Sequence, residues 1–380
     1  MTQVLIADDN AIFREVLKRH VASLFGYDVI EAATGLDAVA LAETRHPDLI
    51  LLDLVMPGLD GIEVIRRIRS NPRLADVPII FLSAETDRRV WAEALSAGAN
   101  DFMPKPYHRS ELAARINLHL KLASLGQELR RQNDLLTRER YLAGCVQRQL
   151  LPRDLEFPGL ESAAVYQAQE QVGGDFYDAW DDGAAVYVLM ADISGHGASA
   201  AMLMAACKGY LVSLRQAGLG PVELVSSLNA MLCDLLLGGD LDNMFMTLAL
   251  CRIDRAAPLL TVVSAGHVPV YVLGRAGLTE LPSQGPALGI LPDCAWTPQT
   301  TPFEPGDTVF LYTDGLTELR SPEGEFFGEE RVLGKLRPGT APRDLIGEII
   351  ETALPFCKGI LHDDLAMVAV RRLAPGDRLA

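Results

Sequence analysis

The first 120 residues alternate short, continuous apolar runs with longer amphipathic segments. The runs at 4–7, 50–52 and 79–82 are apolar at every position, which is typical of strands that are buried on both faces of a sheet. The segments between them repeat their apolar residues with a helical period and therefore predict covering helices. We expect an α/β domain built on a doubly wound, five-stranded parallel sheet, with its site at the carboxyl ends of the strands.

A different period occupies residues 118–150, which contain no proline. Spacings of four and three alternate along a seam in which eight of ten residues are apolar, at positions 118, 122, 125, 129, 132, 136, 139, 143, 146 and 150. This pattern is typical of a coiled coil, although one long amphipathic helix packed on its own domain would also produce it. We favour a parallel two-helix stalk over 118–136, and Pro152 ends the helix.

From about residue 153, strand-like runs predominate, and two helical stretches near 198–216 and 221–237 interrupt them. Strands in succession with helices grouped beside them indicate an α+β domain with antiparallel sheets. The expected organisation is a first domain at 1–120, a helical coiled-coil linker at 121–151, a second domain at 152–373 and a C-terminal tail at 374–380.

Composition narrows the range of partners. Thirty-four Lys and Arg against fifty Asp and Glu give a formal net charge of −16, which argues against nucleic acid because duplex binding requires a basic face. No stretch of about 18 uncharged apolar residues occurs, so no membrane partner or span is expected. The first residues lack the pattern of a secretory signal, and six scattered cysteines without a CxxC pair suggest a reducing cytoplasm.

Candidate chemistry gathers at the strand ends of the first domain. Asp8 and Asp9 close its first strand, and Asp53 closes the third. Ser83 closes the fourth strand, and Lys105 follows the fifth. Three carboxylates can hold a hard cation such as Mg²⁺, and a hydroxyl and an ammonium at the same edge suit the oxygens of a phosphoryl group. Helix capping would explain single members of this set but not all of them.

This set resembles the receiver domain of two-component response regulators, which has a flavodoxin-like fold. The acidic pair, the DxxMPxxDG motif, the serine and the KP dipeptide follow in order over essentially all of residues 1–120. The resemblance implies that Asp53 accepts a phosphoryl group from a cognate histidine kinase or phosphotransfer protein. It also implies a Mg²⁺ ion bound by Asp9 and Asp53, with Asp8 acting through water and Val55 through its carbonyl.

Three further roles follow from the same resemblance. Lys105 would pair with the phosphoryl group, and the Lys105–Pro106 peptide bond would be cis. Ser83 and Phe102 would form the pair of switch residues that respond to phosphorylation.

In the second domain, four carboxylates stand at strand ends beside glycine or another aspartate: Asp175, Asp192, Asp314 and Asp363. Glycine beside a carboxylate lets the backbone turn sharply and bring a carbonyl close to a cation. Carboxylates that converge from distant segments suit two hard cations, which polarise a phosphate and supply a hydroxide nucleophile. Any one Asp-Gly pair is explained by an ordinary turn, but four in this order are not.

The second domain resembles the SpoIIE-like branch of the metal-dependent protein phosphatase (PPM) family over residues 143–372. GGDFYD, ADxSGHG, SAGH, GPALGI, YTDGxxE and DD occur in family order. The resemblance implies an antiparallel β-sandwich flanked by helices and a pair of Mn²⁺ or Mg²⁺ ions. Asp192 would bridge the ions, with the carbonyl of Ile193 on one of them. Asp314 and Asp363 would bind the other ion. Asp175 would complete the site through metal-bound water, and Asp175 and Asp192 are the two catalytic candidates.

Several residues near these motifs need separate interpretations. Ala366 stands where the family commonly has threonine, which removes a hydroxyl, but we still expect catalysis because every metal carboxylate is present. His196 and His267 are expected to support turns or ligands and not to bind metal. GGDF at 173–176 looks like the GGDEF signature of cyclic-dinucleotide synthases, but Phe176 replaces the glutamate, so we reject that function.

Together the resemblances imply a response regulator in which phosphorylation of Asp53 controls a protein serine/threonine phosphatase. The expected substrate is a phosphorylated anti-sigma-factor antagonist of the STAS type, in a partner switch. We expect a homodimer through the linker and receiver, and we expect residues 141–151 to contain the switch. The sign of the regulation stays open.

Two other functions compete with this hypothesis. A non-catalytic adaptor that binds a sigma factor or its regulators is the main alternative, and the retained carboxylates favour the enzyme over it. A transcription factor would need a basic recognition helix, and the arginine-rich stretch at 130–140 is more simply the solvated face of the linker helix.

Overall fold

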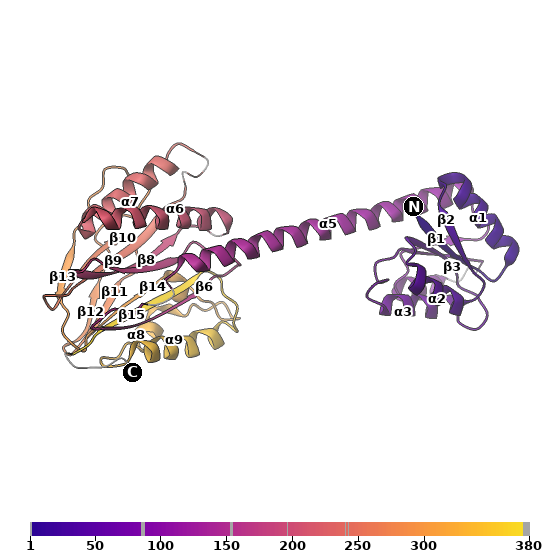
Figure 1. Ribbon diagram of the computed structural model, residues 1–380. Coiled ribbons are helices and arrows are strands. Elements are labelled where there is room, and N and C mark those ends of the chain that lie inside the picture. Colours follow the sequence, from indigo (N-terminus) through magenta and orange to yellow (C-terminus); the bar gives the residue numbers. More distant parts are fainter. Residues whose placement is uncertain are drawn as a thin grey trace. The chain divides into compact units, whose positions relative to one another are not determined.

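The computed structural model describes residues 2–84, 88–152, 155–195, 197–239, 241 and 243–374. Internal contacts divide the chain into two compact units, Met1–Leu135 and Leu136–Ala380. One helix, α5 (Arg109–Leu150), contributes residues to both units (Figure 1). The last residues of the expected C-terminal tail, 375–380, lie outside the described part.

The first unit contains a five-stranded parallel sheet with the strand order β2-β1-β3-β4-β5. Its strands are β1 (Gln3–Ala7), β2 (Asp28–Ala32), β3 (Leu49–Asp53), β4 (Ile79–Ser83) and β5 (Asp101–Pro104). Its helices are α1 (Ala11–Phe25), α2 (Gly35–Arg45), α3 (Gly61–Ser70), α4 (Arg88–Ser96) and the first turns of α5. The predicted doubly wound α/β sheet is confirmed.

Alternate residues of each strand enter two different cores, which explains the continuous apolar runs. Leu5 and Ile50 pack with residues of α2, α3 and α4, whereas Val4 and Leu49 pack with residues of α1 and α5. All five residues of β3 are buried, and the first four, Leu49 to Leu52, alternate between the two cores.

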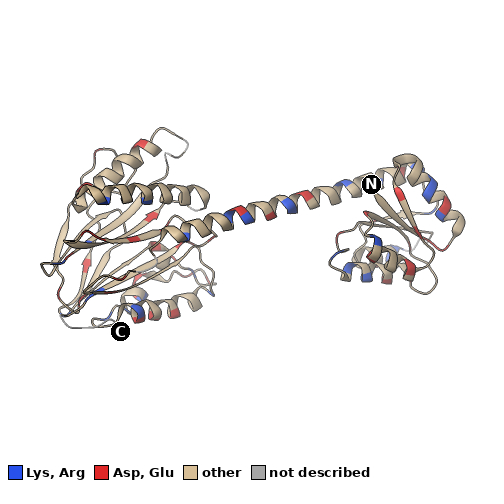
Figure 2. Cartoon of the chain, in the orientation of Figure 1, with Lys and Arg blue, Asp and Glu red and all other residues tan. Residues whose placement is uncertain are grey.

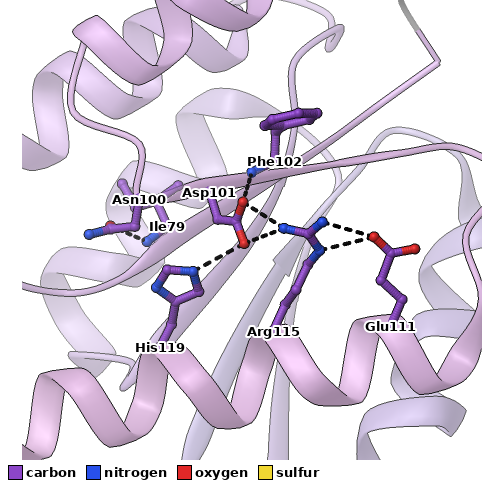
Figure 3. Close-up of polar contacts among 7 residues, drawn as sticks. All are labelled: Ile79, Asn100, Asp101, Phe102, Glu111, Arg115 and His119. Carbon is purple, nitrogen blue, oxygen red and sulfur yellow. Dashed lines mark hydrogen bonds and ion pairs between the residues drawn. The ribbon is translucent and has the colours of Figure 1, made fainter.

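A polar network attaches the start of α5 to β5 (Figure 3). Arg115 donates hydrogen bonds from Nη1 to both carboxylate oxygens of Asp101, at 2.7 and 2.6 Å, and also pairs with Glu111. His119 Nε2 lies 3.2 Å from Asp101 Oδ2, and the backbone N–H of Phe102 donates to Asp101 Oδ1. Burial opposes ionisation of Asp101, but these bonds, led by Arg115, hold the pKa of its carboxyl below the ordinary value.

Further along, α5 carries an exposed row of leucines. Five seam leucines are each more than half exposed: Leu118, Leu122, Leu125, Leu129 and Leu136. Charged residues of both signs occupy other positions along the helix (Figure 2). The predicted continuous helix is therefore confirmed, and its apolar seam does not pack on the first unit over this stretch.

The second unit is a sandwich of two five-stranded antiparallel sheets. One has the order β13-β10-β9-β8-β7 and the other β12-β11-β14-β15-β6. The first sheet comprises β7 (Phe176–Asp181), β8 (Ala185–Ile193), β9 (Met246–Asp254), β10 (Leu259–Ala265) and β13 (Gln299–Pro302). The second comprises β6 (Leu160–Gln167), β11 (Val270–Gly274), β12 (Gly277–Leu281), β14 (Thr308–Tyr312) and β15 (Leu365–Arg372).

Helices cover both outer faces of the sandwich (Figure 1). The first sheet is covered by α6 (Ala198–Leu214) and α7 (Pro221–Leu236), and the second by α8 (Gly328–Leu333) and α9 (Pro342–Phe356). Val188 of β8 and Val368 of β15 share the core between the sheets, whereas Leu189 faces the core under α6 and α7. The predicted helix-flanked antiparallel sandwich is confirmed.

None of the helices in the described ranges combines the length and the apolar character that a bilayer span requires.

Candidate functional site

The first candidate site lies at the carboxyl ends of the parallel strands. Carboxylate oxygens of Asp8, Asp9 and Asp53 lie within 4.8 Å of one another. Asp8 and Asp53 are buried, and Asp9 is exposed. Lys105, which follows β5, places Nζ 2.7 Å from Asp8 Oδ2 and 2.9 Å from Asp53 Oδ2. The topology thus brings together the acidic group and the lysine that the strand ends predict.

The turn after β5 fixes the lysine. The backbone N–H of Lys105 donates to the carbonyl of the buried Ser83 at 2.9 Å, and the Lys105–Pro106 bond is cis, as predicted. The ammonium also lies 4.4 Å from the centre of the Phe13 ring. The backbone bond to β4 therefore positions Lys105 so that its ammonium contacts the carboxylates of both Asp8 and Asp53.

Two other predicted residues contact different parts of the domain. Phe102 stacks on Trp91 of α4 at 4.5 Å between ring centres, and Val55 has an exposed side chain with its backbone N–H 3.5 Å from Asp53 Oδ1. Arg14 of α1 was not foreseen from the sequence. Its Nη1 donates to the carbonyl of Asp8 at 2.8 Å and fixes the acidic turn.

Electrostatics make this site suitable for a cation. Burial raises the pKa of Asp53, the hydrogen bond from Lys105 lowers it, and repulsion from Asp8 raises it again, with a net increase. One ammonium faces three carboxylates, so the cluster keeps negative charge that a hard cation would neutralise. The oxygen-only donor set fits Mg²⁺.

The second candidate site lies where the two sheets of the sandwich end together. Asp175 precedes β7 and Asp192 belongs to the end of β8, and the pairing of Phe176 with Ala191 places them opposite each other. Asp314 follows β14 and Asp363 precedes β15, which is the neighbouring strand in the second sheet.

Mutual repulsion within this group is strong. Burial, followed by repulsion from Asp192, raises the pKa of Asp175 well above its ordinary value. Burial, followed by repulsion from Asp314, raises the pKa of Asp192 to about 7, and Asp363 adds to it. Asp175 Oδ2 is buried without a hydrogen-bond partner. Bound cations would relieve both the repulsion and the unpartnered oxygen, so the residues present fit a divalent metal site.

The two sites differ in how closely their oxygens approach. In the described part of the chain, three carboxylate oxygens within 4.8 Å of one another occur at the first site alone. At the second site Asp175 is buried, Asp192 and Asp314 are half-buried and Asp363 is exposed. The four predicted residues are therefore gathered in one electrostatic group, with wider spacing than in the first site.

Close packing explains why the motifs contain glycine at positions 173, 174 and 315. A Cβ atom on Gly173 would lie 1.7 Å from Asp364 Oδ2, and one on Gly174 would lie 2.6 Å from the carbonyl oxygen of Ile193. A Cβ atom on Gly315 would lie 1.8 Å from the carbonyl oxygen of Asp364. Only glycine lets these segments approach each other so closely.

Asp364 is a site residue that the sequence analysis missed. Its buried carboxylate accepts hydrogen bonds from three backbone N–H groups, those of Gln169 at 2.8 Å, Gly174 at 2.7 Å and Asp175 at 3.3 Å. It therefore holds the loop that carries Asp175. The signals available in the sequence were the second aspartate of the DD pair and the adjacent glycines of the GGDF motif.

Gln147 of α5 is a second missed residue. Its side-chain amide donates to the carbonyl of Gly173 at 2.5 Å and accepts from the N–H of Gly173 at 3.0 Å. It is 4% exposed. No motif surrounds it, so nothing in the sequence pattern indicated this contact.

The histidine of the SAGH motif has a structural role. His267 Nε2 lies 3.0 Å from the carbonyl oxygen of Tyr312, which can only accept, so Nε2 carries the proton and Nδ1 accepts from the Thr247 hydroxyl at 2.7 Å. Burial lowers the pKa of His267 to about 4. Both ring nitrogens are occupied, in agreement with the prediction that it is not a metal ligand. His196 lies outside the described residues.

The substitution at Ala366 is partly offset by a neighbour. The backbone N–H of Ala366 donates to the hydroxyl of Thr313 at 3.0 Å. The same hydroxyl hydrogen-bonds Asp175, and this bond favours the charged carboxylate against the larger opposing effect of burial. A hydroxyl is thus present beside the site although residue 366 does not supply it.

Two family models match the chain. The model described as stage II sporulation protein E (SpoIIE) matches residues 182–373. The model described as response regulator receiver domain matches residues 4–117. The SpoIIE match includes Asp192, Asp314 and Asp363 but begins after Asp175, and the receiver match includes every residue predicted for the first site.

Individual proteins match part of the chain. Protein IcfG of Synechocystis sp. (strain ATCC 27184 / PCC 6803 / Kazusa) is 31% identical over 260 residues, which are 60% of this chain and 40% of that protein. Probable transcriptional regulator ycf27 of Porphyridium aerugineum is 41% identical over 119 residues, which are 31% of this chain and 48% of that protein. The chain thus spans less than half the length of these two relatives.

A solved structure supports the fold of the second unit. The SiaA-PP2C domain of Pseudomonas aeruginosa superposes with a TM-score of 0.57 at 19% sequence identity, covering 63% of this chain and 98% of that one.

Proposed function

The chain belongs to the stage II sporulation protein E family and carries a response regulator receiver domain, and on that basis we propose that it is a metal-dependent protein serine/threonine phosphatase under receiver control. The observation that carries the proposal is the convergence of carboxylates from two sheets on one mutually repelling group whose innermost member, Asp175, is buried. A fold that served only for binding would have no need to hold these charges together.

Two Mn²⁺ or Mg²⁺ ions would be held by five groups of this unit: the carboxylates of Asp175, Asp192, Asp314 and Asp363 and the carbonyl of Ile193. When bound, such ions polarise a phosphate and acidify a water molecule. Asp192, which lies at the end of a strand of the first sheet and is repelled by Asp314 and Asp363 beside the second, is suited to the bridging position. Asp364 and Thr313 would keep Asp175 in place, the first through the loop backbone and the second through its hydroxyl.

In the receiver, Asp53 would accept the phosphoryl group, and a histidine kinase or phosphotransfer protein would donate it. Mg²⁺ would be held by Asp8, Asp9, Asp53 and the carbonyl of Val55. Lys105 already contacts Asp53 and would stabilise the added negative charge. Ser83 and Phe102 would then rearrange as the switch pair.

The substrate we propose is a phosphoserine or phosphothreonine of a STAS-type anti-sigma-factor antagonist, on the basis of family resemblance. A second copy of the chain is the partner we propose for the exposed leucine seam of α5.

Phosphate release from a phosphoserine protein with added Mn²⁺ tests the enzymatic proposal. Asp192→Asn should lower the rate by at least about a hundredfold, because a bridging ligand is lost. Asp293→Asn, which removes an exposed carboxylate elsewhere in the same unit, should leave the rate unchanged. Full activity in Asp192→Asn would contradict the assigned site. A wild-type chain that neither releases phosphate nor binds Mn²⁺ would favour the adaptor function.

Receiver control has a separate test. A phosphoryl mimic bound at Asp53 should change the phosphatase rate, the molecular mass measured by light scattering, or both. Asp53→Asn should abolish the response. If neither quantity changes in the wild-type chain, the receiver does not regulate this output.

A further inference from the structure

The last turns of α5 lie directly against the loop that carries Asp175. Three helix positions at intervals of four and three contact three residues of the loop segment 170–173. Arg140 Nη1 lies 3.3 Å from Glu170 Oε2, a Cβ atom on Gly144 would lie 2.0 Å from the carbonyl oxygen of Gln171, and Gln147 hydrogen-bonds Gly173. Residues with this spacing share one face of a helix. We call Arg140, Gly144 and Gln147 the loop-facing stripe.

Gln147 makes the contact that only a primary amide of this length can make. Its NH₂ group donates to the carbonyl of Gly173 while its oxygen accepts from the N–H of the same residue. A carboxylate could only accept, and an aliphatic side chain could do neither. Because the pair is buried, loss of the amide would leave two backbone groups of Gly173 without partners.

The loop is held from its other side by Asp364. That carboxylate accepts from the N–H groups of Gly174 and Asp175. The backbone from Gly173 to Asp175 thus lies between α5 and the start of β15, and neither contact is made by a metal ligand. Withdrawal of Gln147 would leave Asp364 as the remaining side chain of this pair that holds the loop backbone, while Thr313 still hydrogen-bonds the carboxylate of Asp175.

We propose that Gln147 is a positioning residue of the metal site, through which the helical state of the last turns of α5 sets the position of Asp175. The inference rests on the proposed phosphatase function and specifies how the site is regulated. When these turns are helical and the loop-facing stripe is seated, Asp175 is in place. When they fray or rotate, the amide leaves Gly173 and the site loses an ordered ligand.

The loop-facing stripe and the seam of α5 occupy adjacent rows of the helix. The seam continues through the exposed residues Ala143 and Val146, each one residue before a position of the loop-facing stripe, whereas Leu150 packs on the core under α6 and α7. Val146 is 63% exposed while Gln147 is buried. A second helix could therefore pair along the seam without displacing Gln147, and pairing would favour the helical state on which the contact depends.

Two variants test the role of Gln147 against a matched control. Gln147→Leu removes both hydrogen bonds. Gln147→Glu keeps the shape, replaces the donor by a carboxylate oxygen and adds a negative charge close to Asp175. Gln149→Leu changes an exposed glutamine two residues away and serves as the control. Each full-length variant is titrated with Mn²⁺ by calorimetry and assayed with a phosphoserine protein. Hydrogen exchange of residues 169–175 is followed in the metal-free chain.

We expect both Gln147 variants to bind Mn²⁺ at least about tenfold more weakly and to exchange the loop amides faster, while Gln149→Leu behaves as the wild type. Wild-type metal affinity and loop exchange in Gln147→Leu, which removes both hydrogen bonds without adding charge, would overturn the inference even if the enzyme is active. If the wild-type chain proves inactive, the proposed function fails, and the exchange of the loop still decides the role of Gln147: faster exchange supports it, and unchanged exchange overturns it.

Discussion

Gly173 packs so closely against Asp364 that a side chain at this position would disturb the metal site. A methyl group there would meet Asp364 Oδ2 at 1.7 Å, so either the carboxylate or the loop has to move. We expect Gly173→Ala to weaken Mn²⁺ binding at least about tenfold and to cost about 1–3 kcal/mol of stability. Calorimetry and urea unfolding measure the two effects. Gly209→Ala, in an open position of α6, is the control and should be neutral or slightly stabilising. Wild-type metal affinity in Gly173→Ala would contradict this account of the loop.

His267 gives the second unit a defined acid response. Its pKa of about 4 lies below the ordinary value of 6.5, so between these values the unfolded chain binds more protons than the folded one. The stability that depends on neutral His267 is complete above about pH 6.5 and is lost as pH falls toward 4, by up to about 3 kcal/mol. Urea unfolding at several pH values should show a steeper loss for the wild type than for His267→Gln. Equal slopes would show that His267 does not titrate in this way.

At the scale of elements, the exposed leucine seam of α5 is the surface on which we expect two copies of the chain to pair. A charged residue in a paired seam would be buried beside its counterpart, so Leu129→Glu should weaken self-association at least about tenfold. Gln127→Glu adds the same charge outside the seam and should have no comparable effect. Light scattering over a range of concentrations distinguishes the two. A wild-type chain that stays monomeric throughout would exclude the seam as a dimer contact.

The same helix marks the limit of what its sequence can predict. The seam and the continuity of α5 follow from a local period that any reader of the sequence can count. The attachment of Arg115 and His119 to Asp101 does not, because each partner is an ordinary polar residue whose contact depends on how the helix lies against β5 (Figure 3). Local periodicity predicts helices and strands, whereas the packing of one element on another depends on contacts that follow no repeat in the sequence.

At the scale of the whole molecule, the net charge of −16 includes two concentrated groups of carboxylates. Cations that bind the folded form alone should raise the stability of both units, by about 2.7 kcal/mol each at a hundredfold excess over the dissociation constant. Thermal unfolding with Mg²⁺, with Mn²⁺ and with chelator tests this. In Asp53→Asn, metal should no longer raise the stability of the receiver but should still raise the stability of the second unit. No shift in either transition with either metal would contradict both sites.

The predicted and missed residues differ in one physical respect. Asp53 was predicted because the carboxyl ends of parallel strands meet at one edge of a sheet. Asp192 was predicted because it stands at a strand end in a glycine-containing motif. Asp364 and Gln147 act on backbone groups of a loop that lies 190 and 26 residues away in the chain, respectively. Such contacts have no fixed spacing, and only the folded structure brings the partners together.

The close packing around Gly173 and Gly315 has a consequence for interpreting related genes. A relative that keeps both glycines but has lost the carboxylate equivalent to Asp192 retains the backbone path and loses the cation ligands. A relative with the opposite losses retains the ligands without the path that brings them together. Scoring the two classes of position separately would distinguish folded, metal-free adaptors from chains equipped for metal chemistry, a distinction that a single score for the whole motif conceals.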